Sequence, residues 1–477
     1  MDGDKNDQST VKAAVIGGGL IMVGALQACY LAKRGFQVDL YEGRQDIRTV
    51  EEAKGRSINL ALSVRGRAAL HHVGLEEEIT AAGIPMRARR IHNRAGGLHN
   101  QPYDKDGQAI FSVSRRNLNE KLLTKAESFP NVKLHFQHRL VRADLDKGEL
   151  QFTTSSGDTV TATHDITFGA DGAYSAMRRE LMRGNRINFS QEYIPHGYME
   201  LKIPPTEDGG FAMLPNFLHI WPRDEFMMIA LPNQDHTFTG TLFVPFAIFE
   251  KVQERGEDGV IEFFTKNFPD AIPLIGEESL KNTFMSTKAL PMVSVKCYPY
   301  HRKDKAVLMG DAAHAMVPFY GQGMNCGFED CVVLDEILNK HNNNFKTALP
   351  EFSQVRSPDA QAMCDLALYN YVEMRHLVNS KLFMLNKKID DFLYWLLPKS
   401  YMPLYNMVTF SRIRYSIVIS KWKQQKKFVR FCLISALFAL PMIAGTGYWQ
   451  RSNLSGHRRF NFHWRNIRWE KIGSKQR

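Results

Sequence analysis

The sequence predicts an α/β fold in which a parallel sheet with helices is interrupted by a second, β-sheet domain and followed by C-terminal helices. Three observations predict it. A short apolar strand at 12–16 runs through a glycine-rich turn into a helix and a second strand at 37–41. The segments 165–173 and 305–314 each contain an apolar strand that ends beside an Asp and a Gly. Between them, residues 196–245 contain alternating runs that are typical of strands.

The chain is long enough for two or three domains, and its positive charge is concentrated at one end. It has 477 residues and a net charge of +11. Residues 421–477 hold thirteen Lys or Arg and one acid, whereas the rest of the chain holds 48 bases and 49 acids. A nucleic-acid-binding protein needs basic residues over a folded face, so we expect no nucleic-acid partner. The six cysteines form no CxxC pair, and we expect no metal site.

An uncharged stretch of nineteen residues lies at 431–449 between basic residues. As a helix it would be about 28 Å long, close to the thickness of a bilayer's hydrocarbon core. Tyr448 and Trp449 would close it as interfacial aromatic residues. The alternative is a buried core helix, which rarely runs this far without a charge. We therefore expect a helical region at 376–427, a transmembrane anchor at 431–449 and a basic tail at 450–477, with no N-terminal signal before them.

The glycine-rich turn after the first strand has the composition of a nucleotide-binding loop. Glycines let the backbone approach a pyrophosphate, and the N-terminus of the following helix favours negative charge. Glu42 ends the second strand, where a carboxylate can accept hydrogen bonds from ribose hydroxyls. The spacing departs from GxGxxG, because Met22 stands at the third glycine position and Gly24 follows two residues later. We assign the excess to Ile21 and Met22 and expect it to bulge the loop or shift the start of the helix.

Two distant segments support the same site. Asp171 and Asp311 each stand at the end of an apolar strand, where a carboxylate can bond a ribose or another polyol. After Asp311, the glycine-rich segment 318–325 leads into a second helix, whose N-terminus would stabilise negative charge on a flavin ring. Each motif alone is also compatible with an ordinary strand–turn–helix. The three motifs in this order favour a dinucleotide-binding domain.

These motifs resemble the FAD-dependent aromatic hydroxylases of the para-hydroxybenzoate hydroxylase type. Further segments are similar to the kynurenine 3-monooxygenase family within that group: GRSINLALSVRGR, GIPMRAR, YIPHGYMEL, FPDAIPLIGE, LYNYVEMR and PLYNMVTFSRIRY. The resemblance covers about residues 11–450. It implies a Rossmann-like FAD-binding domain in two parts, at 11–195 and 301–375, with a substrate-binding β-sheet domain at 196–300 between them.

The resemblance also implies a function in tryptophan degradation and NAD biosynthesis, through the kynurenine pathway. NADPH would reduce FAD, and O₂ would then give a flavin C4a-hydroperoxide that hydroxylates L-kynurenine to 3-hydroxykynurenine. The family further implies the outer mitochondrial membrane as the location. There, a C-terminal single-pass anchor would contact membrane lipid and the catalytic domain would face the cytosol.

The resemblance assigns site residues that would not stand out from the sequence alone. Those that match the family's cofactor contacts are Gly17, Gly19, Val23, Gly24, Tyr41, Glu42, Gly43, Arg44, Ala61, Arg115, Leu140, Asp311, Met324 and Asn325. Those that match its contacts with the substrate, whose carboxylate suits an Arg, are Arg89, Tyr103, Asn370, Tyr405 and Phe319. The candidates for an apolar pocket around the substrate ring are Leu218, Ile220, Ile229, Phe243 and Phe319.

Two polar residues near the second glycine-rich segment need separate interpretations. Gln322 is expected beside the flavin face, where it would position peroxide or substrate, and it is the one residue assigned a catalytic role. His314 could suggest a metal ligand or a base. No partner ligands are spaced around it in the sequence, so we expect a structural histidine.

Two other functions stay open at this point. A related flavin hydroxylase or epoxidase could act on a membrane-dissolved substrate, although a lipid needs no carboxylate clamp. A weakly active or FAD-deficient variant could act as a membrane-bound interaction protein, because the two-residue excess in the glycine turn could weaken pyrophosphate contacts. Turnover of L-kynurenine tests the first alternative, and the flavin absorbance of the purified protein tests the second.

Overall fold

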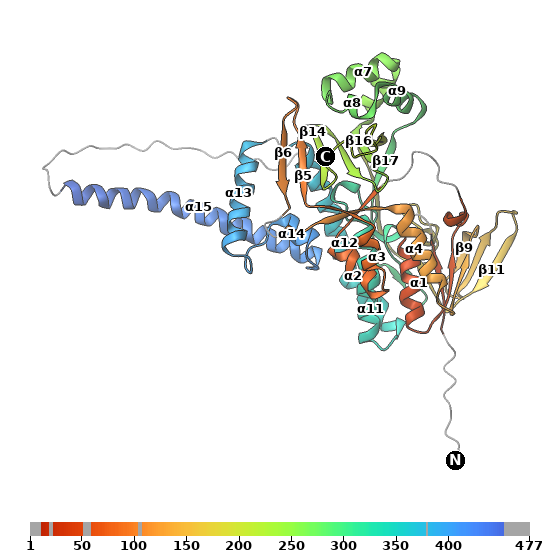
Figure 1. The fold of residues 1–477 in the computed structure, drawn as a ribbon. Coiled ribbons are helices and arrows are strands. Elements are labelled where there is room, and N and C mark those ends of the chain that lie inside the picture. Colours follow the sequence, from red (N-terminus) through yellow and green to blue (C-terminus); the bar gives the residue numbers. More distant parts are fainter. Residues whose placement is uncertain (1–10, 19–21, 51–58, 104–106, 378–379, 453–477) are drawn as a thin grey trace. The chain divides into compact units, whose positions relative to one another are not determined.

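The computed structural model describes residues 11–18, 22–50, 59–103, 107–377 and 380–452 (Figure 1). The chain forms two compact units, of which the first ends at Ser420 and the second begins at Lys421.

A six-stranded sheet forms the base of the first unit, in the order β18-β19-β12-β1-β2-β8. All neighbouring strands are parallel except β18, which pairs antiparallel at one edge. Helices α1, α4 and α11 pack on or beside this sheet. The bounds are β1 (Lys12–Ile16), β2 (Gln37–Tyr41), β8 (Val132–His135), β12 (Ile166–Gly169), β18 (His301–Arg302), β19 (Ala306–Leu308), α1 (Val23–Lys33), α4 (Arg115–Glu127) and α11 (Gly323–Lys340). The predicted α/β fold with a parallel sheet is confirmed.

A seven-stranded sheet forms the second layer, in the order β17-β13-β16-β15-β14-β5-β6. Its strands are β5 (Ala88–His92), β6 (Leu98–Pro102), β13 (Asn188–Ile203), β14 (Phe217–Arg223), β15 (Phe226–Pro232), β16 (Phe238–Pro245) and β17 (Leu290–Tyr298). Four helices share an apolar core with this sheet: α6 (Phe246–Glu254), α7 (Gly256–Asn267), α8 (Ile272–Ile275) and α9 (Glu277–Ser286).

The division into consecutive residue ranges does not follow the two sheets. β5 and β6 fall within 11–195, the range expected for the first part of the cofactor domain. They nevertheless belong to the seven-stranded sheet, because β5 pairs in parallel with β14. This pairing brings Arg89 into the seven-stranded sheet.

The first unit also contains two smaller sheets and several short helices. Two three-stranded sheets have the orders β3-β7-β4 and β11-β10-β9. Their strands are β3 (Asn59–Leu62), β4 (Ile84–Met86), β7 (Ile110–Ser114), β9 (Arg139–Asp144), β10 (Glu149–Thr153) and β11 (Thr159–Thr163). The short helices are η1 (Ile47–Thr49), α2 (Val64–His72), α3 (Glu76–Ala81), α5 (Ala176–Arg183), α10 (Asp311–His314) and η2 (Pro318–Tyr320).

The excess of two residues in the glycine turn precedes helix α1 and does not lie within it. The helix begins at Val23, so Gly24 stands in its first turn. A Cβ at Gly24 would lie 1.9 Å from the carbonyl oxygen of Gly17, so only glycine allows the helix to approach β1 this closely. Gly24 therefore performs the packing role of the third glycine of the motif, despite its displaced position. Residues 19–21, which include Gly19 and Ile21, lie outside the described part of the chain.

The C-terminal helices follow in order along the chain: α12 (Phe345–Arg375), α13 (Lys381–Leu396), α14 (Leu404–Thr409) and α15 (Tyr415–Ser452). The backbone of 431–449 belongs to α15, but most side chains of this stretch lie outside the described residues, as does the tail from 453. Among the residues that are described, none of the helices is both long and apolar enough to cross a membrane.

Candidate active site

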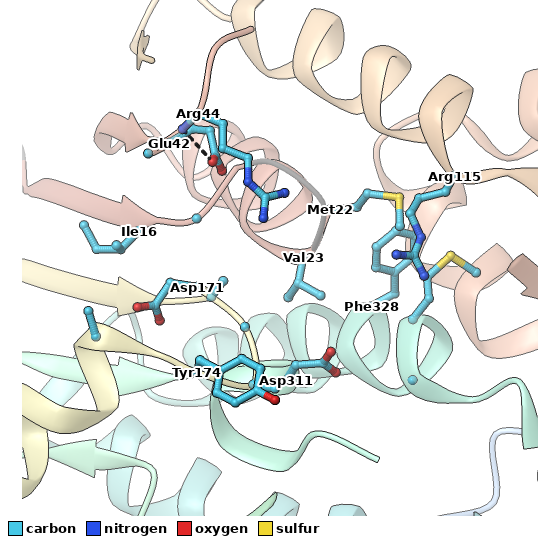
Figure 2. Close-up of a pocket in the computed structure, with 18 of the residues that line it drawn as sticks. Ile16, Met22, Val23, Glu42, Arg44, Arg115, Asp171, Tyr174, Asp311 and Phe328 are labelled. Carbon is cyan, nitrogen blue, oxygen red and sulfur yellow. Dashed lines mark hydrogen bonds between the residues drawn. The ribbon is translucent and has the colours of Figure 1, made fainter. Parts of the chain in front are cut away.

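A cavity of about 810 Å³ lies at the carboxyl ends of β1, β2 and β12 (Figure 2). Gly17 follows β1, Glu42 follows β2, Asp171 follows β12, and Asp311 begins α10. The carboxyl ends of parallel strands meet at one edge of a sheet, so residues from distant parts of the sequence line one space. A Cβ at Gly17 would lie 2.5 Å from the carbonyl oxygen of Ala170, which explains the glycine and its positive φ of 99°.

The wall beyond β2 suits a ribose. Glu42 Oε1 accepts a hydrogen bond from the backbone N–H of Arg44 at 3.0 Å, and both side chains lie together in Figure 2. The same part of the lining holds Tyr41, Gly43 and Leu140. All five residues are among the predicted cofactor contacts, and the carboxylate is placed where ribose hydroxyls could donate to it.

Two partly buried side chains of opposite charge line another part of the cavity, where Arg115 begins α4 and Asp311 begins α10 (Figure 2). Burial lowers the pKa of Arg115, and the nearby Asp311 carboxylate opposes this effect. Burial raises the pKa of Asp311. Among the described residues, the buried Nε of Arg115 has no hydrogen-bond partner. A buried guanidinium N–H without a partner is unfavourable, so this position suits an anionic or polyol ligand.

The chemistry of this cavity fits a dinucleotide such as FAD. It combines close-packed glycine backbone and a helix N-terminus for a pyrophosphate, a carboxylate for ribose and a buried guanidinium. The predicted contacts that line it are Gly17, Val23, Tyr41, Glu42, Gly43, Arg44, Ala61, Arg115, Leu140, Asp311 and Met324.

A second cavity, of about 320 Å³, adjoins the first on the side of the seven-stranded sheet. Eight residues line both: Asn59, Ala61, Arg115, Ala173, Asp311, Met316, Pro318 and Gly321. The apolar candidates that line the smaller cavity are Leu218, Ile229, Phe243 and Phe319. Ile220 was expected with them, but it is buried in β14 and lies outside the lining.

The smaller cavity contains a buried cation. Arg89 is 3% exposed, and its Nη1 donates to Glu373 Oε1 at 3.2 Å. Its guanidinium carbon lies 4.5 Å from the centre of the Tyr405 ring. Burial disfavours the charge, but Tyr405 and Glu373 outweigh it and raise the pKa of Arg89 above its ordinary value. Among the described residues, the buried Arg89 Nε has no hydrogen-bond partner. A guanidinium that lines a cavity suits an anionic group of a ligand.

The other predicted substrate contacts lie near this cation. Asn370 and Tyr405 line the smaller cavity with Arg89. Asn370 Nδ2 donates to the carbonyl oxygen of Phe319 at 2.7 Å, which fixes its side chain beside η2. Tyr103 does not reach the lining. Its ring stacks on the Tyr405 ring with 5.1 Å between the centroids, so it supports a residue that does line the cavity.

Comparisons with known proteins agree with this geometry. A family model described as an FAD binding domain matches residues 10–367. Kynurenine 3-monooxygenase from Sus scrofa is 53% identical over 430 residues, which cover 90% of each chain. The enzyme of the same name from Anopheles gambiae is 52% identical over 446 residues, which cover 93% of this chain and 91% of the relative.

This chain belongs to the kynurenine 3-monooxygenase family.

Solved structures show the same fold at much lower identity. Tetrameric 2-methyl-3-hydroxypyridine-5-carboxylic acid oxygenase matches with a TM-score of 0.61 and 20% identity, covering 75% of this chain and 90% of that one. PqsL from P. aeruginosa, in complex with 2-aminobenzoylacetate, matches with a TM-score of 0.61 and 17% identity, covering 77% and 97%. These likenesses support the architecture of this kynurenine 3-monooxygenase family member.

Besides Tyr103, three predicted site residues among the described ones lie outside both linings. Gly24 packs on Gly17, as described above. Asn325 connects β3 to the turn before α11: Nδ2 donates to the carbonyl oxygens of Ala61 and Gly321, both at 2.7 Å, and Oδ1 accepts from the Ser63 N–H. Asn325 therefore positions lining residues, although its own side chain does not line either cavity.

The third is Gln322, which was assigned a catalytic role. Its side chain is 2% exposed and does not line either cavity. Its Oε1 accepts a hydrogen bond from the Tyr415 hydroxyl at 3.1 Å. Gln322 is the N-cap residue of α11, and its amide oxygen contacts the first residue of α15. This placement indicates a structural contact.

His314 has partners that the sequence spacing did not reveal. Its Nε2 lies 2.7 Å from Asp330 Oδ2, and its Nδ1 lies 3.9 Å from Cys326 Sγ. Burial alone would lower the pKa of His314, but the Asp330 carboxylate raises it well above its ordinary value. The three side chains could hold a metal ion by geometry. However, Arg356 donates to Asp330 Oδ1 at 2.6 Å and to Cys326 Sγ at 3.2 Å, so two of the three side chains already have a cationic partner. The expected structural role of His314 is consistent with this ion-paired network.

Several lining residues were not predicted. Among these, Arg139, Tyr174, Arg179 and His138 line the larger cavity. Asp171, which was expected from its place at the end of an apolar strand, lines the same cavity. The smaller cavity also includes Tyr198, Thr239, Thr241, Met292 and Met374. They come from four separate elements, and no local motif distinguishes them from ordinary strand or helix residues.

The contact between Tyr415 and Gln322 predicts the effect of Tyr415→Phe. Loss of one buried hydrogen bond should lower the free energy of unfolding by about 1 kcal/mol. Flavin content and kcat should stay close to those of the parent, because neither side chain lines a cavity. Denaturant titration and steady-state assays measure both. Tyr300→Phe is the matched control, since the buried Tyr300 hydroxyl has no partner among the described residues. A large loss of kcat with full flavin would contradict a structural role for Gln322.

Proposed function

We propose that this chain hydroxylates L-kynurenine at ring carbon 3, with FAD as its cofactor and NADPH and O₂ as co-substrates. One observation carries the proposal: a cavity suited to a dinucleotide adjoins a smaller apolar cavity that contains a buried cation. Kynurenine has a carboxylate at one end and an aromatic ring at the other, which matches the cation and the apolar walls. The names of the relatives support this choice of substrate.

Bound FAD would supply the oxygen-transfer chemistry, which no protein side chain provides. The residues of this chain bind and orient the two molecules. Glu42 and Arg115 would hold the ribose and the charged or polyol part of FAD. Arg89 would bind the kynurenine carboxylate. Part of its present contact with Glu373 would then be replaced by the contact with the substrate.

The walls of the smaller cavity would also exclude water and orient the substrate ring. Phe243 and Phe319 pack edge to face at 4.9 Å between ring centroids, and Phe319 stacks on Tyr371 at 3.8 Å. This rigid aromatic wall excludes water from the reacting ring, which limits side reactions of the activated oxygen. With the carboxylate at Arg89, the aromatic ring points toward the eight residues shared with the larger cavity, where substrate and cofactor must meet.

The direct test uses purified protein. Incubation with NADPH, air and L-kynurenine should give 3-hydroxykynurenine, identified by mass, in proportion to the NADPH consumed. A preparation with full flavin content and no such product would contradict the proposal. Turnover of a sterol or quinone instead would favour the alternative of a membrane-dissolved substrate.

Flavin absorbance tests the alternative of an FAD-deficient interaction protein. The motivation for that alternative was the two-residue excess in the glycine turn. Helix α1 keeps its register against β1, because Gly24 packs on Gly17. We therefore infer that the cofactor site is functional, and stoichiometric flavin in the purified protein would exclude the alternative.

We also propose that residues 431–449 anchor the chain in the outer mitochondrial membrane, with the catalytic unit in the cytosol. The stretch is uncharged over nineteen residues, and basic residues border it on both sides. Each basic residue near an anionic leaflet contributes about 1 kcal/mol to binding.

Truncation tests the anchor. Removal of 421–477 should release the protein from membranes into the supernatant after centrifugation, because both the apolar stretch and its thirteen basic residues are lost. Removal of 452–477 alone is the matched control, and this variant should stay with the membranes because the apolar stretch remains. Membrane retention of the shorter chain would contradict the proposed anchor.

A further inference from the structure

Arg65 connects three segments that are far apart in the sequence. It is the second residue of α2, and its side chain is fully buried. Its Nη1 donates to Glu329 Oε1 in α11 at 2.7 Å, its Nε donates to the carbonyl oxygen of Val408 at 3.0 Å, and its Nη2 donates to the carbonyl oxygen of Ile413. The guanidinium carbon also lies 3.9 Å from the centre of the Tyr415 ring. One side chain therefore holds the end of α14 and the start of α15 against α11.

Helix α14 needs such support because it is short. It has six residues, and a helix of this length is not stable without tertiary contacts. Val408 lies in its last turn, where the backbone carbonyl groups have no partner within the helix. Arg65 satisfies one of these carbonyl groups, and its positive charge is favourable at the negative end of the helix dipole. The position of α14 therefore depends on Arg65.

Helix α14 carries a residue of the smaller cavity. Tyr405 lines that cavity, and its ring faces the Arg89 guanidinium at 4.5 Å and stacks on the Tyr103 ring at 5.1 Å. The backbone of α14 determines where this ring lies. Arg65 itself lines neither cavity. Any influence of Arg65 on a bound substrate must therefore pass through α14.

A chain of buried ion pairs connects Arg65 to the cofactor cavity. Glu329 Oε2 accepts from Arg356 Nη1 at 3.0 Å, and Arg356 Nε donates to Asp330 Oδ1 at 2.6 Å. Asp330 Oδ2 accepts from the N–H of Gly310 at 2.7 Å, and Gly310 directly precedes the residue that begins α10 and lines both cavities. Desolvation offsets much of the attraction in buried ion pairs, so the fixed geometry explains this chain better than added stability does.

We propose that Arg65 is a positioning residue for the substrate cavity: it holds α14 so that the Tyr405 ring lies against Arg89. This inference rests on the proposed binding of the kynurenine carboxylate at Arg89. The planar guanidinium donates to one carboxylate and to two backbone carbonyl groups at the same time. A lysine there would still neutralise Glu329, but its single nitrogen could not make the same contacts with α11 and α14 together. The Tyr405 ring would then move away from the carboxylate end of the substrate.

Arg65→Lys in the FAD-loaded full-length chain tests this role. The KM for L-kynurenine and its dissociation constant, measured from the change in flavin absorbance, should both rise by roughly fivefold to tenfold, the effect of one lost contact. Flavin content and kcat should stay within about twofold of the parent, because the cofactor contacts are unchanged. In a Tyr405→Ala background, Arg65→Lys should cause no further rise, because Arg65 acts on the substrate through Tyr405.

Two other variants complete the test. Arg34→Lys is the matched control, because Arg34 also donates to α11, at Asp335 Oδ1 and the Asp335 carbonyl oxygen, but lines neither cavity. It should lower the melting temperature and leave the KM unchanged. Ser411→Ala loosens the turn after α14, since the Ser411 hydroxyl donates to the carbonyl oxygen of Met407 and accepts from the N–H of Ile413. It should raise the KM by about twofold, and it decides the question if Arg65→Lys does not fold.

The possible outcomes distinguish this inference from the proposed function. An unchanged KM in flavin-loaded Arg65→Lys overturns the inference, and so does an equal rise with and without the Tyr405 ring. If Arg65→Lys does not fold, an unchanged KM in Ser411→Ala overturns it. When the parent hydroxylates L-kynurenine, each of these results shows that Arg65 serves the fold alone and leaves the proposed function intact. A flavin-loaded parent that does not hydroxylate L-kynurenine contradicts the proposed function, and this inference with it.

Discussion

Arg89→Ala should lower kcat/KM for L-kynurenine by about 10²- to 10³-fold while flavin content stays close to one per chain. The guanidinium is the buried cation of the smaller cavity, and its removal leaves the substrate carboxylate without a partner. Loss of one partner of a buried, hydrogen-bonded charge pair costs about 2–5 kcal/mol, which corresponds to this range. Most of the effect should be in KM, because the contact is made in the ground state as well as during the reaction.

Two further variants separate binding from stability. Arg89→Ala also leaves the Glu373 carboxylate partly buried without its cation. The double variant Arg89→Ala/Glu373→Gln should recover the stability lost in the single variant, as measured by thermal unfolding, but not the affinity for kynurenine. Arg90→Ala is the matched control on the opposite face of β5, where the Arg90 guanidinium lies over the Phe217 ring. Normal kcat/KM in Arg89→Ala would show that another group binds the carboxylate.

Gly24→Ala should lower the affinity for FAD by about tenfold or more. The added Cβ would lie 1.9 Å from the carbonyl oxygen of Gly17, and a backbone atom cannot rotate away as a flexible side chain can. Helix α1 must move away from β1, and the Gly17 backbone and the helix N-terminus both line the cofactor cavity region. Forced overpacking of this kind costs about 1–3 kcal/mol, and here the displaced atoms are the proposed pyrophosphate contacts.

The absorbance ratio of flavin to protein, measured after dialysis against known FAD concentrations, gives the affinity. Gly35→Ala is the matched control. Gly35 has a φ of 84°, but a Cβ there meets no atom within 4 Å. Gly35→Ala should therefore lower stability through backbone strain and leave FAD affinity unchanged. If Gly24→Ala keeps full flavin content, then the helix approach does not set the cofactor site.

The parallel sheet and its cofactor edge could be predicted because their signals are local. An apolar strand, a glycine turn and an acid at the end of the next strand lie within one short segment, and Gly17 and Glu42 line the cavity as expected. Asp311 was found in the same way from the strand that precedes it. Backbone geometry at a strand end restricts which residues fit there, so these positions can be recognised without knowledge of the rest of the fold.

The substrate cavity could be predicted only through the family resemblance. Arg89 lies among several arginines in the sequence, and its burial follows from the parallel pairing of β5 with β14. Tyr405 and Asn370 join it from helices near the other end of the chain. The misplacement of Gln322 and of Ile220 has the same origin, because the direction of a side chain depends on what packs around it.

By itself, the sequence determined the α/β class, the nucleotide edge of the sheet, and a chain whose positive charge lies beside one apolar stretch. The tertiary structure decided which side chains meet. It placed the excess of the glycine turn before α1 and paired His314 with Asp330. The physical reason is range: strand ends and turns are set by neighbouring residues, whereas burial, ion pairing and unused hydrogen-bonding groups depend on long-range packing that no local pattern records.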